Sequence, residues 1–164
     1  MPAARSFREL KVYLAARDGA REIFVLTKAF PREERYALVD QVRRCSRAIK
    51  AMLAEAWARR RYKAAFINKI DEAMGECNET QSWLDDALDA GDLSREAFQR
   101  LDHAYQGIGG MLSRMIDRAD DFCKHAPSTD YRTLREDAAD GDYSPFTDHD
   151  SPPLTGDESP FTVH

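Results

Sequence analysis

Residues 30–63, FPREERYALVDQVRRCSRAIKAMLAEAWARRRYK, decide the fold of this 164-residue chain. Pro31 predicts the start of a helix, because a proline in the first turn lacks only an N–H that would be unpaired there. Two adjacent stripes follow at spacings of three and four: Glu34, Leu38, Gln41, Cys45, Ala48, Met52 and Glu55, and Val39, Val42, Ser46, Ile49, Leu53 and Ala56. A helix with one neighbour needs one apolar stripe. We therefore expect this helix to pack inside its own bundle and against something else.

The same stretch carries a dense run of positive charge. From Arg43 to Lys63, eight basic residues stand against the single acid Glu55: Arg43, Arg44, Arg47, Lys50, Arg59, Arg60, Arg61 and Lys63. Residues 71–89 have the opposite pattern, with seven acids and no lysine or arginine. The formal net charge of −5 therefore hides a segregation of charge, which says more about partners than the total does.

Three further helices are predicted around this one. Apolar spacing indicates helices over about residues 7–28 and 61–89, and a fourth from the candidate N-cap Ser94 to about Phe122. Gly91 is expected to end the third helix. Short connections make neighbouring helices antiparallel, so an all-α, up-down-up-down four-helix bundle is predicted for residues 1–124.

Glycines lie in the middle of the fourth predicted helix, at Gly107, Gly109 and Gly110. We expect them to allow the close approach of a neighbouring helix, and a functional kink is the alternative. Gly19, in the first helix, should cost about 1 kcal/mol relative to alanine.

Residues 125–164 are predicted to form a separate acidic tail, which is disordered on its own. The segment holds nine acids and two arginines and too little apolar surface to offset its ordering entropy. A degenerate Ser-Pro-Phe-Thr motif recurs near its end, and its members are candidates for docking a protein partner: Pro145, Phe146, Pro160 and Phe161. The tail could instead only solubilise the chain, or lie over the basic run and compete with nucleic acid.

Composition places the chain in a reducing cytoplasm. No apolar run approaches the ~18 residues that a membrane-spanning helix requires. The three cysteines, Cys45, Cys77 and Cys123, are widely spaced and odd in number. We therefore interpret them as small buried hydrophobic residues, and not as disulfides or metal ligands.

Several polar and apolar positions together match a known bacterial family: Phe7, Leu10, Phe30, Pro31, Glu34, Leu38, Gln41, Arg44, Ile49, Glu55, Tyr62, Phe66, Ala73 and Glu79. Over roughly residues 6–120 the chain resembles the four-helix-bundle proteins typified by the 23S rRNA intervening-sequence protein, also labelled ribosomal protein S23. These are related to the accessory variability determinant of diversity-generating retroelements. Two positions depart from the family pattern, since Ala56 stands where glycine is usual and Cys77 where serine is usual.

The resemblance implies a bundle that assembles into a homopentameric ring. For the retroelement branch it also implies binding to nucleic acid and to a reverse transcriptase. A head-to-tail ring needs two complementary surfaces on each subunit. The basic run and the acidic residues 71–89 could supply them, which is a rival explanation for the basic run.

The sequence contains no convincing catalytic, cofactor or metal motif. The four histidines are not grouped, and no acid precedes a histidine by three residues, as di-iron bundles require. There is no Cys-x-x-Cys, phosphate-binding glycine loop or His-Glu-x-x-His. We therefore expect a protein that is not an enzyme and holds no cofactor or metal.

Four polar residues lie on or near the apolar stripes: Glu34, Gln41, Glu55 and Glu79. A buried carboxylate must be paired or hydrogen-bonded, because its desolvation otherwise costs several kcal/mol. We expect a structural polar network with arginines such as Arg44.

The basic run is the best functional signal, because such clusters neutralise phosphates and release counterions. Trp57 and Tyr62 are the only evident candidates for stacking on bases. The sequence thus predicts a ring-forming accessory protein that binds RNA or DNA through its eight basic residues. The alternative is an interaction scaffold that uses its acidic tail and does not bind nucleic acid.

Overall fold

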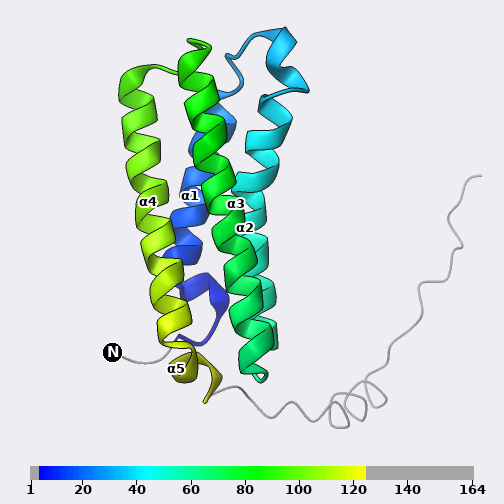
Figure 1. Cartoon of the computed structure of the whole chain (residues 1–164), viewed down its shortest axis with the longest axis vertical. Coiled ribbons are helices and arrows are strands. Elements are labelled where there is room, and N and C mark those ends of the chain that lie inside the picture. Colours follow the sequence, from blue (N-terminus) through cyan, green and yellow to red (C-terminus); the bar gives the residue numbers. More distant parts are fainter. Residues whose placement is uncertain (1–3, 125–164) are drawn as a thin grey trace, which may run out of the picture. The chain divides into compact units, whose positions relative to one another are not determined.

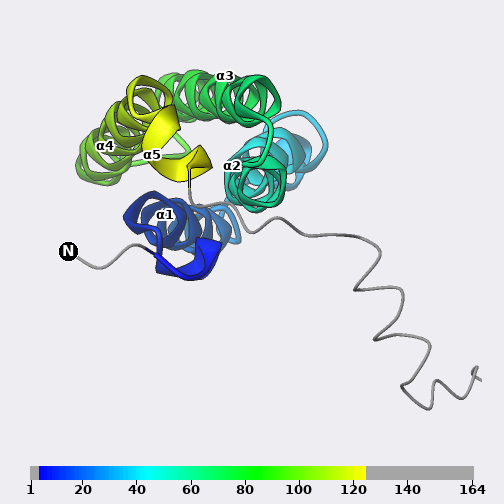
Figure 2. The same cartoon turned by 90° about the horizontal axis from the view of Figure 1, so that it is seen from below.

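The computed structural model describes residues 4–124, which form four long helices. These are α1 (Lys11–Leu26), α2 (Val39–Arg59), α3 (Lys63–Asp89) and α4 (Arg95–Asp117). They run alternately up and down, and each packs beside its neighbours in the chain (Figure 1). Seen from one end, α1 lies between α2 and α4 and so closes the bundle (Figure 2). The predicted all-α four-helix bundle is confirmed.

Three short elements interrupt helices that the sequence predicts as continuous: η1 (Phe7–Glu9), η2 (Arg32–Arg35) and α5 (Ala119–Cys123). The fourth predicted helix breaks at Arg118, whose φ of −108° and ψ of 26° leave the helical region. The chain then turns into α5 at the end of the bundle (Figure 2). There the Phe122 ring stacks on Phe66, with 5.6 Å between the ring centroids.

The predicted start of α2 is wrong. Pro31 has a φ of −54° but an extended ψ of 152°, and it precedes the 3₁₀ turn of η2 instead of an α-helix. The tighter 3₁₀ geometry turns the chain from α1 towards α2 within a few residues. The buried Leu38 then leads into α2 at Val39. Glu34 consequently lies on η2 and not on a stripe of α2.

The two predicted boundaries between α3 and α4 are confirmed. Gly91 has a φ of 79°, which a residue without a Cβ adopts at little cost after the last turn of α3. The Ser94 hydroxyl accepts a hydrogen bond from the Ala97 N–H at 3.2 Å and so caps α4.

One stripe of α2, from Val39 to Ala56, is buried within the bundle, whereas the other is buried only in part. The helix lies between α1 and α3, and its buried residues are Val39, Val42, Cys45, Ser46, Ile49, Leu53 and Ala56. Gln41, Ala48 and Met52 of the other stripe are half-buried and Glu55 is exposed, so the expected contact outside the bundle stays a prediction. Within residues 4–124, no helix combines the length and the hydropathy that a membrane crossing requires.

Among the glycines, the closest approach occurs in α1 and not in α4. A Cβ added at Gly19 would lie 3.1 Å from the ring and hydroxyl of Tyr105, a fully buried residue of α4. In α4, only Gly109 faces a neighbouring helix, because a Cβ added there would lie 3.7 Å from the sulfur of Met74. Helix α4 is continuous from Arg95 to Asp117, so its glycines do not break it.

Candidate nucleic-acid interface

The eight basic residues predicted to bind nucleic acid have three different surroundings. Arg43, Arg47 and Lys50 lie on the side of α2 that faces α1. Arg44 turns towards α3, because successive residues of a helix point about 100° apart. The other four lie where α2 ends and α3 begins: Arg59, Arg60, Arg61 and Lys63.

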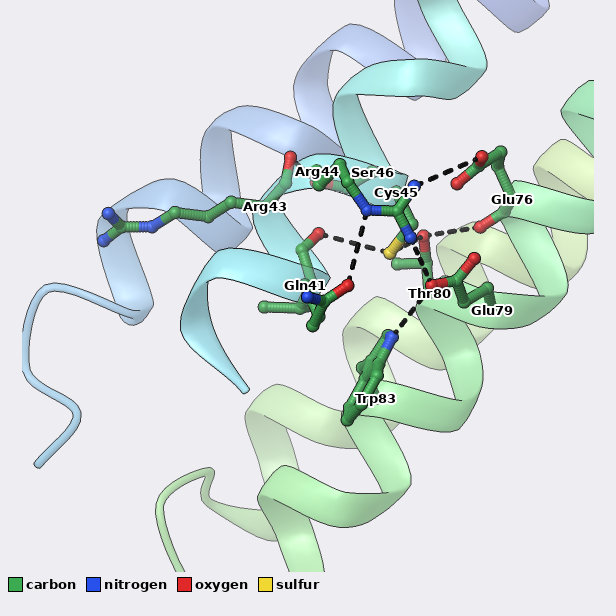
Figure 3. A network of polar contacts seen from close by, with 10 residues as sticks. Gln41, Arg43, Arg44, Cys45, Ser46, Glu76, Glu79, Thr80 and Trp83 are labelled. Carbon is green, nitrogen blue, oxygen red and sulfur yellow. Dashed lines mark hydrogen bonds and ion pairs between the residues drawn. The ribbon is translucent and has the colours of Figure 1, made fainter. Parts of the chain in front are cut away.

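Arg44 belongs to a polar network between α2 and α3 (Figure 3). Its guanidinium lies 2.6 Å from Glu79 Oε1 and 3.5 Å from Glu76, and the charge of Glu79 raises its pKa. Gln41 Oε1 accepts a hydrogen bond from Arg44 Nε at 3.4 Å, and Trp83 Nε1 donates to Glu79 Oε1 at 3.2 Å. Arg44 therefore links two helices within the subunit.

Glu55 and Glu34 lie apart from this network. The Glu55 carboxylate is 3.2 Å from Lys69 Nζ and 3.7 Å from the guanidinium of Arg59. Glu34 lies on η2, where its carbonyl accepts a hydrogen bond from the Leu38 N–H. The four residues predicted to form one network are thus divided: Gln41 and Glu79 meet, and Glu55 and Glu34 do not join them.

The basic residues at the corner between α2 and α3 are engaged with neighbouring groups. Lys63 Nζ is 2.9 Å from Asp120, and it holds the pKa of that carboxyl below its usual range. Arg60 lies 4.1 Å above the Trp57 ring and donates to the Trp57 carbonyl at 2.5 Å, and burial lowers its pKa. Arg61 stacks on Tyr62 at 5.8 Å. A phosphate at this corner would compete with contacts that already exist.

An open groove of about 380 Å³ lies between α1 and α2. Its lining comprises Tyr13, Arg17, Ala20, Arg21, Phe24 and Val25 from α1, and Arg47 and Lys50 from α2. Within residues 4–124, no carboxylate forms an ion pair with Arg17, Arg47 or Lys50. Arg21 reaches Asp18 at 3.8 Å, but both side chains are more than 70 % exposed. The described residues thus leave the positive charge of the groove almost unneutralised.

Phe24 is surrounded by positive charge at one end of this groove. Lys28 Nζ and Arg43 Cζ each lie 4.8 Å from the centre of its ring, and Arg47 Cζ lies 5.4 Å away. Arg43 Nε donates to Thr27 Oγ1 at 2.8 Å, which leaves the terminal nitrogens of the guanidinium for a ligand. We call the following set the basic groove: Arg17, Arg21, Lys28, Arg43, Arg47 and Lys50.

Half of the basic groove escaped the sequence analysis. Arg17, Arg21, Phe24 and Lys28 follow one another at spacings of four, three and four, which places the first three on one face of α1 and Lys28 in the turn directly after it. That spacing could have identified the basic face of α1 from the sequence. The nearby acids Asp18 and Glu22 lower the net charge of the segment, so no basic run is evident there. The structure also adds Phe24 and Tyr13 to the aromatic residues beside basic ones, where the sequence offered only Trp57 and Tyr62.

A metal site is a poor interpretation of the polar atoms between α2 and α3. Cys45, Glu76 and Glu79 offer ligand atoms within 4.8 Å of one another. However, burial raises the pKa of the Cys45 thiol, which favours the protonated form that binds metal weakly. The Arg44 guanidinium already supplies the positive charge at these two carboxylates.

The residues predicted to dock a partner through the tail lie outside residues 4–124. These are Pro145, Phe146, Pro160 and Phe161. Their role stays a prediction, as does the division of the chain at residue 125.

The fold and the groove together define a class: a four-helix-bundle protein with a basic, aromatic-containing groove between α1 and α2. Residues 8–114 match the 23S rRNA-intervening sequence protein family, and the chain belongs to this family. The resemblance seen in the sequence is therefore confirmed at the level of the family. The relation to retroelement accessory proteins stays a prediction.

A solved structure supports the same assignment. A protein with unknown function of the S23 ribosomal protein family from Bacteroides thetaiotaomicron is 27 % identical, with a TM-score of 0.59. The similarity covers 64 % of this chain and 97 % of that chain. No curated protein matches the sequence.

Proposed function

We propose that this protein is a non-enzymatic accessory protein that binds nucleic acid through the basic groove. The observation that carries the proposal is the set of six basic residues on adjacent faces of α1 and α2 and in the turn after α1, of which only Arg21 has a carboxylate partner within residues 4–124. Unpaired cations hold counterions, and their release on contact with phosphates favours binding.

The assignment differs from the sequence prediction in its boundaries. Arg43, Arg47 and Lys50 stay in the proposed site, and Arg17, Arg21 and Lys28 join them. Arg44, Arg59 and Lys63 leave it because each is paired with a carboxylate, and Arg60 leaves it because it donates to the Trp57 carbonyl. Arg61 lies beside Tyr62 at the same corner, outside the groove. A cation that is already paired with a neighbouring group contributes less binding free energy when it contacts a phosphate.

The proposal includes assembly into a ring, beside a nucleic-acid-processing partner such as a reverse transcriptase. The resemblance supports both parts, and the family's name, which refers to 23S rRNA, makes RNA the first ligand to test. Five acids of α3 are exposed and could face a neighbouring subunit: Asp71, Glu72, Asp85, Asp86 and Asp89.

The test is a salt titration of fluorescence anisotropy with labelled structured RNA and duplex DNA. Wild type should bind more weakly as salt rises, and Arg17→Gln/Arg47→Gln/Lys50→Gln should reduce the salt slope by about 2 to 3. A matched control, Arg59→Gln/Lys63→Gln/Arg118→Gln, removes the same charge elsewhere and should keep the wild-type slope.

Two results would contradict the proposal. An equal loss in the control would place binding at the corner or make it a response to net charge alone. Absence of binding by wild type at low salt would remove nucleic acid from the function altogether.

A further inference from the structure

We infer that the groove between α1 and α2 binds single-stranded nucleic acid, with one unpaired base against Phe24 and the flanking phosphates on the basic residues. The inference rests on the proposed function and adds the class of ligand to it. Single-stranded binding sites combine a positive groove with aromatic rings on which bases stack, because every base has a π-face.

The shape of the groove fits a base better than it fits a double helix. At about 380 Å³ it is near the lower end of the ~300–1,000 Å³ range of small-molecule sites. Ala20, which is buried, gives the groove a small residue between Tyr13, two helical turns before it, and Phe24, one turn after it. A duplex keeps its base faces stacked inside, so it would use only the charges and leave Phe24 without a role.

Phe24 is available for such a contact. Its residue is 37 % exposed although it belongs to the helix that closes the bundle. Exposure of an aromatic ring to water is unfavourable. The cations of Lys28, Arg43 and Arg47 stabilise the exposed ring through its quadrupole. Guanidinium planes beside a ring can also stack on a base, so a base could contact Phe24 and an arginine together.

The phosphate contact beside this ring is organised before the ligand arrives. Thr27 is only 6 % exposed, and its hydroxyl donates to the Ile23 carbonyl at 2.7 Å while accepting from Arg43 Nε. The hydroxyl is therefore fixed, and it holds Arg43 by one nitrogen. The remaining nitrogens match the geometry of a phosphate, which two parallel N–H donors bind well.

The experiment compares three probes of equal phosphate number: oligouridylate, the same strand with abasic positions, and a hairpin duplex. An oligodeoxythymidylate arm separates RNA from DNA. Wild type should prefer the intact strand over the abasic strand, and Phe24→Leu should weaken intact-strand binding roughly five- to tenfold. The variant keeps all charges, so its salt slope and its duplex affinity should equal those of wild type.

Tyr62→Leu is the matched control, because Tyr62 is 63 % exposed, lies beside an arginine and is outside the groove. It should bind like wild type. Salt-dependent binding that is the same for intact and abasic strands and indifferent to Phe24→Leu would overturn this inference and leave the proposed function standing. No binding of any probe would overturn both.

Two further controls exclude a structural origin of the effect. Thermal melting should show that Phe24→Leu stays folded at the temperature of the binding assay. Light scattering should show that Phe24→Leu has the same mass as wild type. A smaller particle would mean that the groove forms contacts between copies of this chain, and would overturn the inference.

Discussion

Gly19 lies in the interior of α1 because Tyr105 packs against it. The ring and hydroxyl of Tyr105 would be 3.1 to 3.2 Å from a Cβ at this position, which is tighter than an ordinary van der Waals contact. Tyr105 is fully buried, so the ring has little room to move away. The cost of a glycine in a helix is thus offset here by a large aromatic residue that fills the core.

We predict that Gly19→Ala lowers stability, although alanine is the better helix former. Overpacking costs about 1–3 kcal/mol, and the gain in helix propensity is about 1 kcal/mol, so a net loss of about 1 kcal/mol is expected. Urea unfolding followed by circular dichroism would measure it. Gly107→Ala is the control, because a Cβ there meets no atom within 4 Å, and it should stabilise the protein by about 0.5–1 kcal/mol. Stabilisation by both substitutions would show that Tyr105 yields easily.

The thiols provide a second test at the scale of single residues. Burial raises the pKa of all three thiols, that of Cys77 to about 11, but Cys123 is only partly buried and so is the most accessible to a reagent. Only thiolates react with disulfide reagents, so Cys123 should react first in the folded protein at pH 8 and the other two only on unfolding. Mass spectrometry after timed labelling would identify the order. Early labelling of Cys45 or Cys77 would indicate local opening of the bundle.

At the scale of elements, α2 separates two tasks on two faces. Arg44 pairs with Glu79 across the contact with α3, while Arg47 faces the groove beside α1. We predict that Arg44→Gln lowers the free energy of unfolding by about 1 kcal/mol or less, since half of the side chain is exposed, and leaves nucleic-acid affinity unchanged. Arg47→Gln should weaken nucleic-acid binding and leave the free energy of unfolding unchanged. The melting temperature and the anisotropy titration of both variants, compared in one buffer, would check this, and equal binding losses would refute the separation.

Periodicity in the sequence was sufficient to predict the long helices, since each buries an apolar seam against its neighbours. It could not place the start of α2, because Pro31 suits the first turn of an α-helix and of a 3₁₀ turn equally well. It could place Arg43, Arg47 and Lys50 on one stripe. Periodicity could not show that these three residues lie beside Arg17 and Lys28. That depends on how α1 is rotated about its axis, which the packing around residues such as Tyr105 determines.

At the scale of the whole molecule, one groove of this size makes few phosphate contacts and should bind weakly by itself. Assembly into a ring would place several identical grooves on one particle. A second groove reached by the same strand is then bound at a high effective concentration, which raises the overall affinity by about 10²–10⁴ without any new kind of contact.

We therefore predict that affinity depends on strand length in a stepwise manner. Strands too short to reach a second subunit should bind with the affinity of one groove, and affinity should rise steeply once two grooves can be occupied. A series of oligouridylates of increasing length, with light scattering to give the mass relative to the 18.7 kDa chain, would measure the step. If the protein is a monomer, affinity should rise only gradually with strand length. Each added nucleotide then gives only one more position at which the strand can occupy the single groove. A sharp step in affinity for a monomer would contradict the link between assembly and binding. An oligomer whose affinity shows no step would have grooves that are too far apart for one strand, or that are covered at the subunit contacts.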